Sequence, residues 1–528
     1  MTRAGAALLL LLAAVMPATS RPASALDEDD APGAPGTPET VRVEGEGDRA
    51  PTDLTGAVTI IRAADFASRI TSLPELLDEV AGLRVRAYGG LGAFATVAIR
   101  GSTAEQVNIY MDGVLLNSAL GGGVNLADLS LASIDTIEIY RGFTPSFLTT
   151  GSIGGVINIR TKRPAPPSGD DAPRRVSQTG AVSYGSLKTA EAAGAVSWSG
   201  RRLDGLVSGE LTRTDGDFKF FDNNGTTLDG GDDRFATRRN NDFERADLLG
   251  RAGAALGDDA RLDFQAGFTT RAQGVPGIDA LQSEDARARG TRALLKAGYS
   301  KDSFLIDRLR LNLDLSHTRT TQEFEDRSGD TTGGLETDSK AVLDATGLSA
   351  LYRWHPGGSG RAGHHVTILE SVLRETAALT DRLDRDAGTE RSYRTGVALS
   401  VEDEIHLAGS RLIVSPSVRW ERFANRFEGE AGTDDSYLTA RLGAAWHARN
   451  DLMLRAGAGH FNRQPSFLEI FGDQGPVKGG GAGLLPEAGV NYDIGMTWDP
   501  AGKGPLDRFH LETTLFSRQA SELIQPPA

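Results

Sequence analysis

The residues that could bind a cation are concentrated in one acidic stretch. Asp222-Asn223-Asn224-Gly225 and Asp229-Gly230-Gly231-Asp232-Asp233 supply carboxylate and amide oxygens, which are the ligands that Ca²⁺ prefers. The stretch lacks the ligand spacing of an EF-hand loop. The pattern therefore favours a solvated acidic loop over a calcium site.

No other set of residues has the spacing of an active site or a metal centre. The 8 histidines are scattered, and the adjacent His364 and His365 would point to opposite faces of a strand. The sequence contains no His-Glu-x-x-His motif and no recognisable pairing of a nucleophile with a base. It also contains no cysteine, which excludes thiol catalysis, Cys-ligated metals and disulfides. We expect no enzymatic activity, no cofactor and no bound metal.

Three glycine clusters resemble phosphate-binding loops only superficially. They lie at Gly89–Gly92, Gly121–Gly123 and Gly151–Gly155, and none has the Walker spacing or the strand–helix order of a dinucleotide fold. Glycine accounts for 64 of the 528 residues, which exceeds the usual share of about 7%. We interpret the clusters as tight turns, where glycine is conformationally permissive.

The first 25 residues are typical of a secretory signal peptide. Arg3 precedes the apolar run Ala6–Val15, and Ala23 and Ala25 are the small residues of a cleavage site after Ala25. The run is too short for a transmembrane helix, which needs about 20 apolar residues. The chain is therefore expected to be exported. Its formal net charge of -15 disfavours nucleic acid as a partner.

The exported chain divides into three parts by sequence pattern. Residues 26–53 are acidic and rich in Pro, Gly and Ala, as in a flexible tether, and the alternating stretch Glu39–Gly45 within them could pair as an added strand. Residues 54–167 predict a mixed α/β domain, with a helix-capping box at Ser72–Glu75. Residues 174–528 predict about fifteen strands, because polar and apolar residues alternate with period two.

The alternating region predicts a transmembrane antiparallel β-barrel rather than a sandwich or a propeller. Its runs are roughly ten to fourteen residues long, and a tilted strand needs about 9–11 residues to cross a membrane. Short connections such as 257–259 alternate with long polar loops such as 217–242. Outer-membrane barrels combine short periplasmic turns with long outer loops. Together with the signal peptide, this pattern indicates a multi-pass barrel in the outer membrane of a Gram-negative cell.

The mature chain resembles a TonB-dependent outer-membrane receptor over nearly its whole length. The following segments match, in order, motifs of that family's plug domain: Leu76–Leu83, Ile99–Gly101, Met111–Val114, Ile137–Gly142 and Gly151–Ile159. Barrel motifs of the family are matched by Phe461–Glu469, Leu485–Glu487 and Asn491–Gly495. The chain departs from the family at Phe147–Thr150, which replaces a usual Tyr-Gly, and at Asp493, where Glu is common.

The resemblance implies a 22-stranded barrel whose lumen holds the mixed α/β plug. It also implies active import of a scarce ligand, such as a siderophore, a corrinoid or a similar metal chelate. The partners would be that ligand, outer-membrane lipid, and TonB with its inner-membrane proton-driven motor, and the receptor would be a monomer. The alternatives are a passive or structural barrel of the porin or adhesin type, or an inactive truncated receptor. The tether and plug favour import, because a passive pore needs neither.

The resemblance also assigns roles to individual residues. The TonB box would consist of Glu39, Thr40, Val41, Arg42 and Val43. A charge lock between plug and barrel would involve Arg100, Glu138, Arg141 and Asp493. The apical loops of the plug would contact the ligand through Tyr88, Leu91, Phe94, Asn117 and Leu120.

The last strand of the chain has no predicted hairpin partner. Residues 509–516 alternate as a strand, and the chain stops at Ala528. Fifteen strands in one chain would leave two open edges facing lipid, where each unpaired backbone group costs several kcal/mol. We therefore expect that Ala528 marks a truncation, either of the sequence or of the gene, with roughly seven strands missing from the family's 22.

Overall fold

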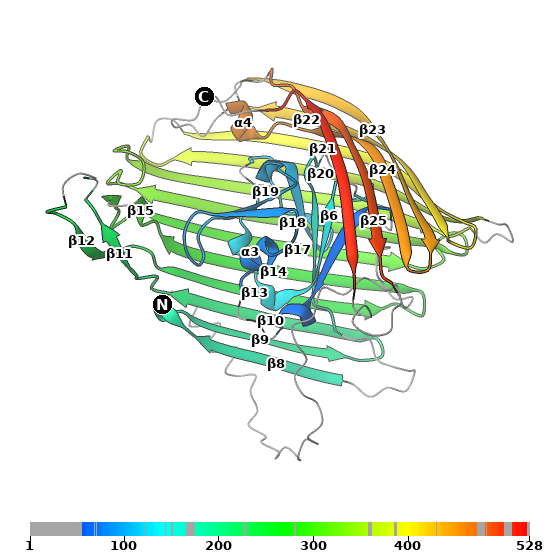
Figure 1. The fold of residues 1–528 in the computed structure, drawn as a ribbon, viewed down its shortest axis with the longest axis horizontal. Helices are drawn as coiled ribbons and strands as arrows, with labels where there is room; N and C mark the ends of the chain where they lie inside the picture. The colour runs from blue at the N-terminus through cyan, green and yellow to red at the C-terminus, as the bar shows by residue number, and fades with distance from the viewer. Residues whose placement is uncertain are drawn as a thin grey trace, which may run out of the picture.

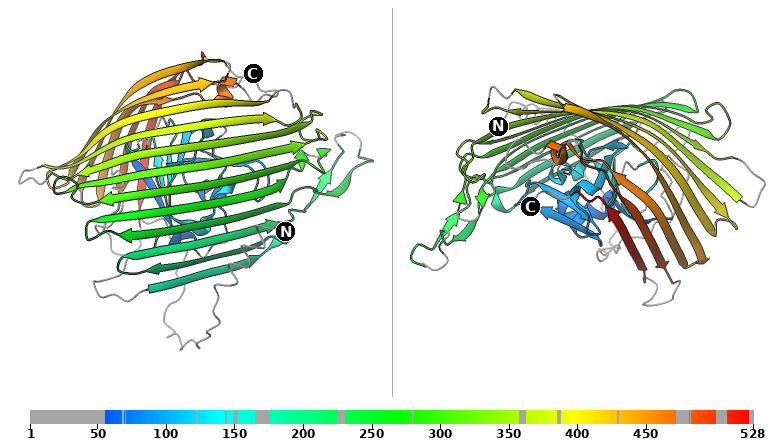
Figure 2. Two further views of the ribbon diagram at one scale, coloured as in Figure 1. Left: turned by 180° about the vertical axis from the view of Figure 1, so that it is seen from behind. Right: turned by 90° about the horizontal axis from the view of Figure 1, so that it is seen from above.

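The computed structural model describes residues 55–524 except 68, 70, 122, 143, 149–151, 165–174, 225, 227–229, 279–280, 357–361, 385–387, 429, 472–480, 482 and 501–508. The predicted signal peptide, the tether and the TonB box at Glu39–Gly45 lie outside the described residues. A fifteen-stranded sheet, here called the wall, curves around a smaller α/β domain on its concave side, here called the plug (Figures 1 and 2).

The plug is built on a five-stranded sheet in the order β1-β6-β7-β4-β5, with β2-β3 as a separate hairpin. Strand β4 runs parallel to β7, and the other pairs are antiparallel. Its strands are β1 (Ala57–Arg62), β2 (Leu83–Ala87), β3 (Ala95–Ile99), β4 (Val107–Met111), β5 (Val114–Leu115), β6 (Ile134–Arg141) and β7 (Gly155–Thr161). Its helices are α2 (Ala63–Phe66), α3 (Leu73–Asp78), η1 (Ala104–Gln106), η2 (Leu126–Asp128) and η3 (Leu131–Ser133).

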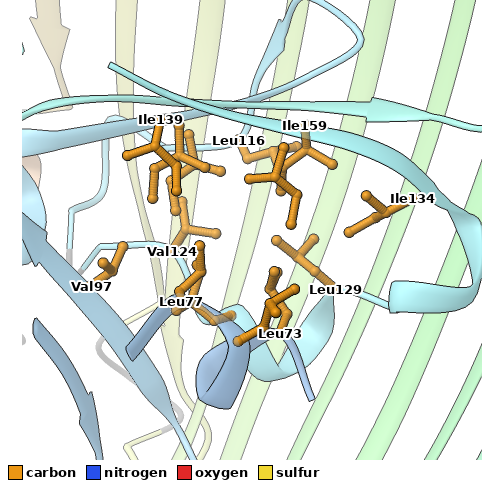
Figure 3. Close-up of a cluster of buried hydrophobic side chains, with 14 of the residues drawn as sticks. Leu73, Leu77, Val97, Leu116, Val124, Leu129, Ile134, Ile139 and Ile159 are labelled. Atoms are coloured by element: carbon orange, nitrogen blue, oxygen red, sulfur yellow. The ribbon is translucent and has the colours of Figure 1, made fainter. Parts of the chain in front are cut away.

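An apolar core lies between the plug sheet and helix α3 (Figure 3). The predicted capping box is present, because the Glu75 carboxylate accepts a hydrogen bond from the Ser72 N–H at 2.8 Å. Leu73 and Leu77 of this helix are fully buried in the cluster that also contains Ile139. Each such side chain contributes about 1.5–3 kcal/mol when removed from water. This core gives the plug a fixed shape of its own inside the curve of the wall.

The wall is one antiparallel sheet in which each strand pairs with the next wall strand of the chain, from β8 to β26. Its fifteen strands confirm the predicted number. They are β8 (Arg175–Tyr184), β9 (Ala190–Ser199), β10 (Leu203–Thr214), β13 (Phe243–Ala255), β14 (Ala260–Gly274), β17 (Arg287–Lys301), β18 (Leu309–Asp326), β19 (Thr337–Trp354), β20 (Ala362–Asp381), β21 (Thr389–Leu407), β22 (Leu412–Phe427), β23 (Glu430–Arg449), β24 (Leu452–Arg463), β25 (Glu487–Trp498) and β26 (Leu511–Ser521).

The wall connections contain the remaining short elements. These are η4 (Ser186–Lys188), β11 (Lys219–Asp222), β12 (Arg234–Thr237), β15 (Gly277–Ile278), β16 (Leu281–Gln282) and α4 (Phe467–Phe471). Within the described part of the chain, no helix has the length and apolar character needed to cross a membrane.

The wall has its polar face inside and its apolar face outside. In β22, Arg419 and Glu421 are only 4% and 3% exposed, whereas Val418 and Trp420 on the opposite face are 48% and 39% exposed. Successive side chains of a strand alternate between faces, so the buried polar residues face the plug. This polarity is the reverse of a water-soluble sheet and is that of a barrel surrounded by lipid.

The connections between wall strands differ in length at the two ends of the sheet. Connections 200–202, 256–259 and 408–411 are short and lie at one end, called the inner end. Connections 215–242 and 464–486 are long and lie at the opposite, outer end. In outer-membrane barrels the short turns face the periplasm. The inner end is therefore the periplasmic one.

Candidate functional site

The predicted charge lock contains one direct ion pair between plug and wall. Arg100 follows β3 in a turn, and its Nη1 bonds to Oδ1 of Asp493 on β25. The two side chains are 6% and 14% exposed. The Arg100 guanidinium also lies 4.5 Å from the ring centroid of Phe516 on β26, in a cation–π contact. Because the desolvation of a buried pair opposes its attraction, its clearest role is to define where the plug sits.

Gly142 provides the space for this ion pair. A Cβ atom at this position would lie 2.7 Å from Oδ2 of Asp493 and 2.9 Å from Nη1 of Arg100. The Gly142 backbone also has a φ of +85°, which side chains disfavour. This glycine ends the Ile137–Gly142 segment that resembles a family motif. Its presence there has a physical reason, since any side chain would push the two charges apart.

The other two predicted lock residues are bonded within the plug. Arg141 donates from Nη2 to the hydroxyl of Thr59 on the neighbouring strand β1. Glu138 accepts from Nε of Arg160 at 2.8 Å and from Nδ2 of Asn158 at 2.9 Å. These two residues therefore hold the plug sheet together, and their part in a lock stays a prediction.

A second charged contact joins the plug to β13 and was not predicted. Asp112, in the turn between β4 and β5, forms an ion pair with Arg251. The Thr161 N–H and hydroxyl donate to the same carboxylate at 3.1 and 2.8 Å, and Gln265 donates at 2.9 Å. Burial alone would raise the pKa of Asp112, but Arg251 and the Thr161 hydrogen bonds outweigh it and hold the pKa below its usual value. The sequence feature that could have indicated this contact is the position of Asp112 within the Met111–Val114 segment, which resembles a plug motif.

Two of the three barrel segments that resemble family motifs meet at one buried guanidinium. Arg463, at the end of β24, donates two hydrogen bonds to Glu469 of α4, at 2.8 and 3.0 Å. Its Nε also bonds to Glu487 of β25 at 2.6 Å. Glu487 in turn accepts from Nε2 of Gln106 in the plug at 3.0 Å. Bidentate arginine–carboxylate contacts are geometrically specific, so this network fixes helix α4 and the start of β25 beside the plug.

Three of the five predicted ligand contacts are exposed in one plug loop. Tyr88, Leu91 and Phe94 are 69%, 44% and 36% exposed, and the rings of Tyr88 and Phe94 lie 6.0 Å apart. Gly92 of this loop lies so close to Phe243 that a Cβ atom would overlap its ring. Because Phe243 begins β13 directly after connection 215–242, the loop lies at the outer end of the wall.

The other two predicted ligand contacts have structural partners. The Asn117 side chain accepts from the Ile109 N–H at 2.7 Å and donates to the Val107 carbonyl at 2.9 Å. Leu120 is only 6% exposed and packs in a cluster with Phe467 of α4. These contacts attach the loop that contains Asn117 and Leu120 to the plug sheet and to α4. Ligand contact by any of the five residues stays a prediction.

A cavity of about 130 Å³, here called the outer cavity, lies between the plug and the wall beside the loop that contains Asn117. Polar side chains in its lining include Asn117, Ser118, Glu375, Arg394, Tyr437 and Gln464. Glu375 accepts from the Ala119 N–H at 2.8 Å, and Arg394 donates to the Pro465 carbonyl at 2.5 Å. Hydrogen-bond donors, acceptors and charges of both signs therefore surround the cavity. Such a lining suits a polar ligand rather than a purely apolar one.

The described residues of the acidic stretch lie at the tip of the β11–β12 hairpin at the outer end. Asp232 accepts from Asn224 at 3.0 Å and from Thr226 at 2.9 Å. Asp222 is buried and lies 3.6 Å from Arg234. Residues 225 and 227–229 are outside the described part. These carboxylates bond to neighbours in the hairpin, and the interpretation as a solvated loop stays a prediction.

Family models match both parts of the chain. The TonB-dependent Receptor Plug Domain matches residues 50–156, and the TonB dependent receptor-like, beta-barrel model matches residues 373–526. The vitamin B12 transporter BtuB of Vibrio cholerae serotype O1 is 37% identical over 106 residues, 20% of this chain and 17% of that protein. BtuB of Photobacterium profundum is 24% identical over 447 residues, 82% of this chain and 62% of that protein. The chain thus spans less than two thirds of these relatives.

Solved structures share the fold. The alcaligin outer membrane receptor FauA from Bordetella pertussis has a TM-score of 0.67 at 15% identity, covering 89% of this chain and 72% of that one. The ferric citrate transporter FecA in its unliganded form has a TM-score of 0.63 at 17% identity, covering 88% of this chain and 74% of that one. Identities this low establish the fold and leave the ligand open.

A polar-lined β wall with an apolar outer face and a folded plug against its lumen defines the class of plugged outer-membrane barrels. Within that class, the chain belongs to the TonB-dependent receptor family. This family consists of outer-membrane receptors rather than enzymes.

Proposed function

We propose that this protein imports a scarce ligand across the outer membrane, using energy delivered by TonB. The observation that carries the proposal is a folded plug held against the lumen face by buried ion pairs, among them Arg100–Asp493, Asp112–Arg251 and Asp128–Arg271. A passive pore has no use for such an obstruction. An obstructed lumen needs work to open, and the outer membrane has no energy source of its own. The work must then come from the inner membrane.

The ligand we propose is a metal chelate, with a corrinoid as the first candidate. The sequence relatives carry the name of a vitamin B12 transporter, and one structural neighbour is a ferric citrate transporter. The outer cavity offers Glu375, Arg394 and Tyr437 to the polar groups of such a ligand. The exposed rings of Tyr88 and Phe94 could pack on a flat macrocycle.

We propose that the TonB box at Glu39–Gly45 couples the receptor by backbone pairing, as strand-addition peptides do. Val41→Pro removes one backbone donor and restricts Thr40. Uptake of labelled cobalamin should then fall to the level of cells without receptor, while cobalamin binding to whole cells stays unchanged. Ala34→Pro, in the Pro-rich part of the tether, is the matched control and should transport normally.

Two results would contradict the proposal at different levels. Normal uptake by the Val41→Pro receptor would show that the box is only a linker. No depletion of cobalamin or of ferric siderophores by cells with the wild-type receptor would argue against import of this ligand class. Running both ligands in parallel therefore separates the coupling from the choice of ligand.

A further inference from the structure

Three histidines and a glutamate from distant parts of the sequence meet at the inner end of the wall. His365 lies near the start of β20, and Glu404 and His406 lie near the end of β21. His355 follows the end of β19. This cluster is at the opposite end of the wall from the outer cavity, and neither the lock nor the TonB box uses it.

Strand register brings these side chains onto one face. In the β20–β21 pair, His365 is opposite Glu404, and Gly363 is opposite His406. Side chains two residues apart on a strand share a face, so Glu402, Glu404 and His406 of β21 point to the same side. Glu402 accepts a hydrogen bond from the Ser146 N–H of the plug at 2.9 Å. The cluster therefore faces the lumen. Gly363 has no side chain, which leaves the space opposite His406 open.

The imidazole rings lie close enough to share an ion. The ring centroid of His365 is 4.7 Å from that of His406 and 4.6 Å from that of His355. Nitrogen or oxygen atoms of His365, Glu404 and His406 that could bind a metal all lie within 4.8 Å of one another. Tetrahedral zinc ligands at about 2.0–2.1 Å from the metal stand about 3.3 Å apart. Small side-chain rotations would close the difference.

A further hydrogen bond orients one of the rings toward the centre of the cluster. The Nδ1 atom of His406 is 3.1 Å from the Ser410 hydroxyl in the β21–β22 turn. Its Nε2 atom faces the Glu404 carboxylate, and the two side chains are 18% and 13% exposed. Metal-binding histidines are commonly held in this way, with one ring nitrogen bonded to a neighbour and the other turned to the metal.

We propose that His365, Glu404 and His406 bind a divalent transition-metal cation, with the His355 ring packed against His365. Imidazole nitrogen with one carboxylate oxygen suits Zn²⁺, Ni²⁺ or Cu²⁺, and the cluster lacks the several oxygen ligands that Ca²⁺ and Mg²⁺ need. A bound ion would join β20 to β21 on the periplasmic side of the wall. The site differs from the sequence-based expectation of no bound metal.

Zinc binding tests the proposal directly. The receptor, purified in detergent from outer membranes without a histidine tag, is stripped with a chelator and dialysed against Zn²⁺ alone. The wild type should bind one ion per chain at this site, and His365→Ala and His406→Ala should each weaken that binding at least tenfold. His364→Ala is the matched control, because His364 pairs with Asp403 at 2.8 Å on the opposite face of the same two strands. It should bind zinc like the wild type.

A second measurement keeps the test independent of the variants. Cu²⁺ bound to the wild-type receptor should show hyperfine coupling to at least two imidazole nitrogens in its electron paramagnetic resonance spectrum. Coordination by oxygen alone would overturn the proposal. Zinc binding by a heat-modifiable His365→Ala/His406→Ala variant that equals wild-type binding would also overturn it. Neither result bears on ligand import, because the lock and the outer cavity lie elsewhere and the TonB box contains none of these residues.

Discussion

Arg100 of the plug and Asp493 of β25 form a buried ion pair although 393 positions separate them in the sequence. One element contributes the cation, the other contributes the anion, and Gly142 lies against both. Any movement of the plug away from the wall must break this contact. The pair therefore reports directly on whether the plug is docked.

Removing one partner should loosen the plug. Asp493→Asn leaves the Arg100 guanidinium buried with less compensation, which costs about 3–5 kcal/mol in comparable buried pairs. Limited trypsin digestion of the purified receptor should cut the plug faster, and calorimetry should show a lower unfolding temperature. Asp434→Asn removes an exposed pair with Arg422 and serves as the control with little expected change. If both variants are digested at the same rate and unfold at the same temperature, the Arg100–Asp493 pair does not hold the plug in place.

Gly142→Ala should disturb the same pair without removing a charge. The new Cβ would lie under 3.0 Å from both Arg100 and Asp493, at a φ of +85°. Gly101→Ala is a matched control, because Gly101 has a φ of +75° but no atom within 4 Å of an added Cβ. Both variants carry backbone strain of about 1 kcal/mol. Thermal unfolding should show a loss at Gly142 at least twice that at Gly101, and equal losses would mean that the crowding relaxes easily.

Asp112 should make plug stability depend on pH. Its pKa is lower in the folded than in the unfolded chain, where an aspartate titrates near about 3.9. Its contribution is therefore fully present above that value and is lost as the pH falls through the folded pKa. Below about pH 4, the wild type should lose stability more steeply than Asp112→Asn in denaturant unfolding. The exposed Asp135→Asn variant should keep the wild-type slope. Parallel slopes for all three proteins would contradict the prediction.

The β11–β12 hairpin should contribute to ligand capture rather than to folding. Deleting Asp222–Asp233 removes its acidic tip at the outer end, where loops tolerate loss. Ligand affinity, measured on whole cells, should fall by about tenfold or more, while the heat-modifiability of the receptor is unchanged. Deleting residues 331–334, in another connection at the same end, is the control. If the affinity is unchanged, the hairpin does not contact the ligand, and the plug loop around Tyr88 and Phe94 becomes the next candidate site.

The wall and the plug could be predicted because both rest on local patterns. Alternation in β22 marks its two faces whatever its neighbours are, and Ser72 and Glu75 form their capping box within one turn. The Arg100–Asp493 pair came from the family resemblance rather than from the pattern. The ligand contacts and the TonB box stay predictions.

The contacts between distant residues could not be predicted, because they depend on strand register and on how the plug docks. Asp112 meets Arg251 only after both are set. His365 and His406 are scattered in sequence and meet only through the pairing of β20 with β21. Leu120 packs against helix α4, a contact that the Phe461–Glu469 segment did not predict, and its contact with a ligand stays a prediction. Each of these outcomes follows from many weak long-range contacts, which a single sequence does not reveal.

The alternation of the wall also decides where this protein can change in length during evolution. Inserting or deleting one residue in the middle of β21 would turn the inward side chains on one side of the change, such as Glu402 and His406, toward lipid, since a shift of one position exchanges the two faces. The same change in connection 215–242 or 464–486 would leave every strand in register. Insertions and deletions should therefore accumulate at the outer end, beside the proposed ligand cavity. Ligand specificity can diverge there while the strands and the docked plug are preserved.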